Sequence, residues 1–137
     1  MVTVSVILYK ASEKEGRHWA IHFEIASTKG KTRHYLHHAT GETHSFEYTK
    51  EEKKYDPTTS SRFFKEIHVT DALDDVDEAE TVMQNVEIDN ENPTWGCQDW
   101  VMDALEALKD AGLIPEQECD NSLDELREWS GFNDESD

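Results

Sequence analysis

The chain has 137 residues and a formal net charge of −18, because 31 aspartates and glutamates outnumber 13 lysines and arginines. This length suits one domain with one core, and the negative field argues against nucleic acid and acidic membranes as partners. No run of about 18 apolar residues occurs, so no membrane span is expected, and two cysteines without a secretory signal point to a cytoplasmic protein with free thiols.

The first half of the chain alternates apolar and polar residues, as half-buried strands do. Strands are expected over residues 2–8, 18–26, 32–39, 43–49 and 62–69. Their short connections favour an antiparallel meander. Residues 50–61 are charged and contain Asp56-Pro57, so a loop is expected there.

The second half changes to helical periodicity. Helices are expected over residues 75–86, 96–111 and 122–129, followed by an acidic flexible tail at 133–137. In the second of these helices, Cys97 shares the apolar stripe, so its sulfur should face the body of the protein. We therefore expect an α+β fold in a single domain over residues 1–132. An antiparallel sheet of about four to five strands packs against the helix that carries Cys97 and against one or two further helices.

Cys97 and His18 form the one pattern in the chain that predicts chemistry. Cys97 lies at the start of its helix, where the positive end of the helix dipole favours a thiolate. His18 opens a strand, and an imidazole on a neighbouring strand is the base that such a thiol needs. Cys119 is predicted to have no role in this site.

Three short segments occur in the order His, His, Cys. Residues 18–21 read His-Trp-Ala-Ile, residues 35–39 read Tyr-Leu-His-His-Ala, and residues 97–101 read Cys-Gln-Asp-Trp-Val. They resemble the circularly permuted branch of the NlpC/P60 papain-like superfamily, to which the lecithin retinol acyltransferase-like proteins belong. Residues 97–101, with Ala-Gly-Leu at 111–113, also resemble an uncharacterised fungal family of this type.

The resemblance implies a papain-like domain with Cys97 as nucleophile, His18 as base and His37 as the group that fixes the tautomer of His18. The implied function is that of a thiol-dependent hydrolase or acyltransferase, which attacks an amide, peptide or ester carbonyl and forms an acyl-enzyme. Gly96 departs from the resemblance, because the relatives have Asn or Asp before the cysteine. The substrate is expected to be a small molecule or a peptide.

The choice among the histidines stays open at this point. His22 shares a strand face with His18, and His38 replaces His37 if the register shifts by one residue. If the catalytic histidine lies on the polar face of its strand, the helix has to pack on that face, against Ala20 and Ala26.

Two other functions compete with the thiol enzyme. Zinc is one, because His18, His22, His37 and Cys97 offer ligands, but no tight ligand spacing occurs and we expect no metal and no cofactor. The other is a non-catalytic acidic interaction module. Residues 69–137 hold 22 acidic and 2 basic residues, a surface suited to a basic protein partner.

Overall fold

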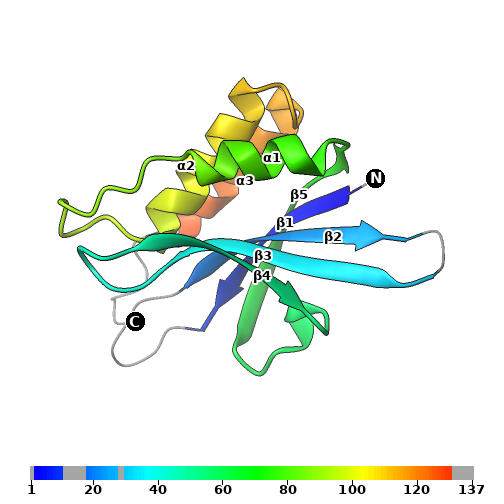
Figure 1. Cartoon of the computed structure of the whole chain (residues 1–137), viewed down its shortest axis with the longest axis horizontal. Helices are drawn as coiled ribbons and strands as arrows, with labels where there is room; N and C mark the ends of the chain where they lie inside the picture. The colour runs from blue at the N-terminus through cyan, green and yellow to red at the C-terminus, as the bar shows by residue number, and fades with distance from the viewer. Residues whose placement is uncertain (1, 11–17, 28–29, 131–137) are drawn as a thin grey trace.

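One antiparallel sheet and three helices make up the computed structural model, which describes residues 2–10, 18–27 and 30–130. The helices all lie on one side of the sheet (Figure 1). The elements are β1 (Val2–Tyr9), β2 (Trp19–Ala26), β3 (Thr32–Thr40), β4 (Glu47–Lys53), the 3-10 turn η1 (Pro57–Thr59), β5 (Phe63–Leu73), α1 (Val76–Gln84), α2 (Cys97–Asp110) and α3 (Glu116–Trp129). The expected α+β class is confirmed, and the predicted tail at 133–137 lies outside the described residues.

The strand order, β4-β3-β2-β1-β5, departs from a simple meander. β5 follows β4 in the chain but pairs with β1 at the opposite edge. β1 is the most apolar strand and is buried along most of its length, so it gains from a partner on each side, whereas the charged β4 suits an edge. Residues 54–62, here called the strap, carry the chain between the two edges over the side of the sheet away from the helices (Figure 1).

Several element boundaries differ from the predicted ones. β4 begins at Glu47 instead of residue 43 and runs through Lys53, so the expected loop at 50–61 is wrong over its first four residues, which alternate across an exposed edge strand. β5 continues to Leu73. α3 begins at Glu116 instead of residue 122, because Pro115 precedes its first turn, where a proline's fixed φ fits the start of a helix.

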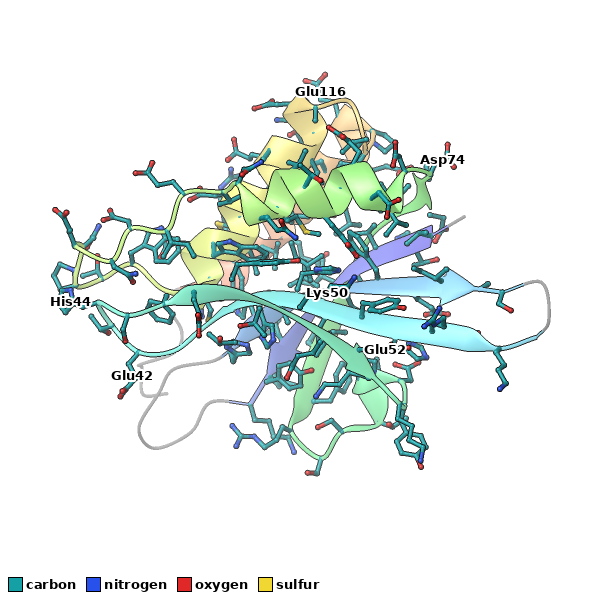
Figure 2. The ribbon with its side chains drawn as sticks, in the orientation of Figure 1. Glu42, His44, Lys50, Glu52, Asp74 and Glu116 are labelled. Atoms are coloured by element: carbon teal, nitrogen blue, oxygen red, sulfur yellow. The ribbon has the colours of Figure 1, made fainter. Side chains whose placement is uncertain are left out.

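The main core lies between the sheet and the helices, on what we call the covered face. Trp19, Ile21 and Phe23 of β2 are fully buried there in one cluster with apolar residues of α2, such as Val101 and Leu105. Burial at roughly 25 cal/mol per Å² makes this layer the main source of stability. Lys50, labelled in Figure 2, also belongs to this side of β4, where its Nζ lies 2.8 Å from the Glu80 carboxylate of α1.

The opposite side, the open face, carries a smaller apolar cluster of Ile7, Ala20 and Leu36, with Tyr9 and Phe63 packed against it. Leu36 of this cluster and Tyr9 beside it line a pocket together with residues of the strap. None of the described helices combines the length and the apolar character that crossing a membrane requires.

Candidate functional site

Strand alternation divides the histidines of β2 and β3 between the two faces of the sheet. Trp19, Ile21 and Phe23 point to the covered face, so His18 and His22 belong to the open face. Ile21 pairs with His37, which places His37 on the covered face and its neighbour His38 on the open one. The site predicted from sequence is therefore split.

Cys97 is the first residue of α2 and is partly buried on the helix side of the molecule. His18 lies on the other side of the sheet, so the structure does not bring the predicted nucleophile and base together. The helices pack against Trp19 and Ile21 and not against Ala20, because the large apolar side chains gain most from burial. A site with Cys97 and His18 required α2 to pack on the polar face of β2, and α2 packs on the apolar face.

His37 is fully buried on the covered face and does not reach His18. Its Nδ1 lies 2.8 Å from the Tyr48 hydroxyl, its ring packs on Phe23, and its Nε2 has no hydrogen-bond partner among the described residues. Burial, followed by the charge of Lys50, lowers the pKa of His37 to about 3. The predicted role of His37 in fixing the His18 tautomer falls instead to His38, the alternative that the sequence left open.

His18, His38 and Glu51 form a continuous hydrogen-bonded chain across three strands. His18 Nε2 lies 2.7 Å from His38 Nδ1, and His38 Nε2 lies 3.1 Å from Glu51 Oε1. An ionised carboxylate only accepts hydrogen bonds, so His38 donates from Nε2 and its Nδ1 is bare. Neutral His18 must then donate from Nε2, which leaves a lone pair on Nδ1. The chain thus fixes His18 in the tautomer that a general base or a metal ligand needs.

The strap and the sheet together line an open pocket beside these three residues. The pocket has a volume of about 540 Å³, within the range of small-molecule sites. Its walls come from the sheet and from the strap: Tyr9, His18, Leu36, His38, Glu51, Lys53, Lys54, Tyr55, Asp56, Pro57, Thr59, Ser60 and Arg62. The crossing from β4 to β5 is what creates it, since the strap has to pass over the middle strands of the sheet.

Three titratable groups of this pocket, His18, His38 and Tyr9, are shifted toward their neutral forms. Burial lowers the pKa of His18 to about 4; the nearby His38 adds to the shift and Glu51 opposes it. Burial also lowers the pKa of His38, again opposed by Glu51. The pKa of Tyr9 rises to about 12 through burial and the charge of Glu51. At neutral pH the chain therefore presents a neutral imidazole backed by a carboxylate.

A second histidine pair lies on the same face. His22 Nε2 is 3.0 Å from His34 Nδ1, the same pair of ring atoms as between His18 and His38. With Glu24 these two residues form a group whose ligand atoms all lie within 4.8 Å of one another. The zinc ligands suggested by sequence do not converge, because His37 belongs to the covered face and Cys97 to the helix layer.

Cys119 is structural, as its predicted lack of a catalytic role implies. It is buried on α3, its Sγ donates to the Leu105 carbonyl at 3.4 Å, and burial raises the pKa of its thiol to about 11. His34 and Glu51 were not predicted as site residues. The signal for His34 was present in the sequence, because His34 and His38 are four residues apart, as are His18 and His22, and this spacing places each pair on one face of its strand.

Comparison with known proteins adds a family and no activity. A family of unknown function, DUF6540, matches residues 4–115. The chain belongs to this family. The DUF6540 match covers both histidine pairs, the strap, Cys97 and all of α2, and it ends just before α3. No curated protein and no solved structure matches the chain.

Proposed function

We propose that the protein binds a small organic anion in the pocket beneath the strap, and that His18 removes a proton from the bound molecule or from a water beside it. The observation that carries this proposal is the chain from Glu51 through His38 to His18, which ends in the pocket. A base positioned in this way contributes about 10²- to 10⁴-fold to a reaction rate.

The charge of the pocket wall supports an anionic ligand. Three cations, Lys53, Lys54 and Arg62, face two carboxylates there, although the whole chain carries −18. Cations at a concave surface attract an anion and fix its orientation. Tyr9 and Tyr55 add aromatic surface to the same wall, which suits a ligand with an apolar or aromatic part.

The histidine chain supports base catalysis more than acid catalysis. With its pKa near 4, His18 is neutral at pH 7 and accepts a proton on Nδ1. The positive charge that forms is stabilised by Glu51 through His38, as a carboxylate stabilises the imidazolium of a catalytic triad. Tyr9, kept protonated by its raised pKa, is a neutral hydrogen-bond donor on the same wall.

Benzoate and 4-acetoxybenzoate test this proposal, because both combine a carboxylate with an aromatic ring and the second is a hydrolysable ester. Benzoate should cause saturable NMR shifts at His18 and Tyr55, and Arg62→Gln should weaken its binding about tenfold. Arg127→Gln removes the same charge from the exposed side of α3 and is the matched control. Hydrolysis of 4-acetoxybenzoate should fall at least tenfold in His18→Asn.

Three outcomes contradict the proposal. Two concern benzoate: NMR shifts that lie outside the pocket, and equal effects of Arg62→Gln and Arg127→Gln on its binding. The third is an unchanged hydrolysis rate of 4-acetoxybenzoate in His18→Asn. Neutral phenyl acetate separates the roles of charge and base: Arg62→Gln should leave its hydrolysis within about twofold of wild type.

A thiol-dependent hydrolase or acyltransferase at Cys97 stays a separate prediction. The position of Cys97 in the first turn of α2 favours it. His37 lies on the side of the sheet that α2 covers, and His18 lies on the other side. The acidic module with a basic partner is likewise a prediction, and the location in the cytoplasm stays one too.

A further inference from the structure

His22 and His34 hold two ring nitrogens in the arrangement that a metal ion needs. They lie on adjacent strands, and both side chains are almost fully buried on the open face. Their Nε2 and Nδ1 atoms are 3.0 Å apart. Two nitrogens bound at about 2.0–2.1 Å to a tetrahedral zinc ion are about 3.3 Å apart, so only a few tenths of an ångström of opening would admit the ion.

Glu24 supplies a third ligand of different chemistry. It pairs directly with His34 across β2 and β3, and its side chain is half-buried. One of its carboxylate oxygens and one nitrogen of each imidazole lie within 4.8 Å of one another. Two imidazoles and one carboxylate suit zinc and similar divalent transition metals, and leave a coordination position for water or a ligand.

Two further carboxylates surround the histidine pair. Glu66 Oε2 of β5 lies 3.9 Å from His22 Nδ1, the ring nitrogen that does not face His34. A metal-binding histidine usually donates its other N–H to such a carboxylate, which orients the ring. Asp56 of the strap adds negative charge near the pair: burial raises its pKa, but hydrogen bonds from Thr58 and, after them, the nearby His34 and His22 lower it below its ordinary value.

We propose that His22 Nε2, His34 Nδ1 and the Glu24 carboxylate bind one divalent transition-metal ion such as zinc, with Glu66 as the residue that orients His22. In the metal-free protein a proton lies between the two ring nitrogens. Both nitrogens must be bare to bind the ion. The ring that carries this proton therefore loses it from the nitrogen that faces the ion and gains a proton on its other nitrogen. While both rings are neutral, this tautomer change releases no net proton. The ion then replaces the hydrogen bond as the link between β2 and β3.

Zinc titration of the chelator-treated full chain tests this site. We expect one ion per chain, a ¹⁵N shift of His22 Nε2 typical of metal coordination, and a protonated His22 Nδ1. Glu24→Gln should weaken zinc binding at least tenfold, and Glu66→Gln should weaken it about 10- to 100-fold. With cobalt in place of zinc, the wild type should give the visible absorption of a tetrahedral site, and Glu24→Gln should reduce it.

The control variants separate this site from surface binding. Glu52→Gln removes an exposed carboxylate of β4 that pairs with Arg33, and should leave zinc affinity within twofold. His38→Asn should do the same, because it alters only the other histidine pair. Equal weakening in Glu24→Gln and Glu52→Gln, or loss of zinc in His38→Asn but not in Glu24→Gln, would overturn the proposal. So would several weak sites without saturation.

Discussion

His18 Nε2 lies 2.7 Å from His38 Nδ1, on the face of the sheet that the helices leave open. This contact joins β2 to β3, and the 3.1 Å hydrogen bond from His38 Nε2 to Glu51 extends it to β4. Because the carboxylate dictates the tautomer of His38, it also dictates that of His18. The tautomer of His18 therefore depends on Glu51, which lies two strands away on β4.

Substitutions of His38 and of Glu51 should move the pKa of His18 in opposite directions. His38→Asn removes a positive charge that competes with His18 for protonation, so the His18 pKa should rise from about 4 toward its ordinary value. Glu51→Gln removes a carboxylate that favours the charged imidazole, so the pKa should fall further. Histidine NMR titration checks both. If the pKa of His18 moved in the same direction in both variants, the hydrogen-bonded chain from His18 through His38 to Glu51 would be contradicted.

The buried His37 should make the protein sensitive to mild acid. Its pKa is about 3 when folded and near 6.5 when unfolded, so between these values only the unfolded chain binds the proton. The free energy of unfolding should therefore fall by about 1.4 kcal/mol per pH unit from this residue as pH drops through that window. His37→Asn keeps a side-chain partner for Tyr48 and removes the titration.

Urea unfolding between pH 7 and 5 measures this contribution. The loss of stability over this range should be about 2 kcal/mol smaller in His37→Asn than in wild type. His44→Asn, at an exposed position with a φ of 72° that Asn tolerates, should keep the wild-type slope. Identical slopes in all three proteins would show that His37 is not buried as described.

Alkylation of Cys97 should not depend on His18. The two residues lie on opposite sides of the sheet, so His18→Ala should leave the pH dependence of the iodoacetamide reaction within about 0.3 pH units of wild type. Cys119 is buried and should react far more slowly, and Cys97→Ser gives the background rate. A rise of one unit or more in the apparent pKa of the Cys97 thiol in the His18 variant would contradict this separation and support the Cys97–His18 dyad predicted from the sequence.

Ile7 tests whether the small apolar cluster of the open face excludes water. This side chain is fully buried although the helices lie on the other side of the sheet. If the cluster packs as described, Ile7→Ala should cost about 2–5 kcal/mol of unfolding free energy, similar to Leu105→Ala in the main core. Denaturant unfolding of both variants compares them. A cost below about 1 kcal/mol for Ile7→Ala alone would mean that water reaches this cluster.

The sequence was sufficient for β1 to β3, because alternation is a local signal. It predicted these strands to within about a residue and placed His18 and His22 on one face, but it began β4 four residues too early and ended β4 and β5 four residues too early. It could not predict which face the helices cover, since that depends on comparing the burial of Trp19 and Ile21 with that of the polar side. The pairing of β5 with β1 is likewise a long-range contact that alternation does not predict. The predicted catalytic site required the helices to cover the face of the sheet that carries His18.

The motif resemblance depends on the same choice of face. Cys97 does begin a helix and His18 does precede a strand, as the motifs imply. Short motifs carry no information on which side of the sheet each residue occupies. Only the register of β2 against β3, with Ile21 opposite His37, shows that His38 and not His37 contacts His18.

The most direct test of the account is the protonation state of His18 in the wild-type protein, measured by long-range ¹H–¹⁵N NMR across a pH titration. We predict a proton on Nε2, a bare Nδ1, and an apparent pKa near 4. A proton on Nδ1 at neutral pH, or a pKa near 6.5, would contradict the hydrogen-bonded chain to Glu51 and with it the proposed base.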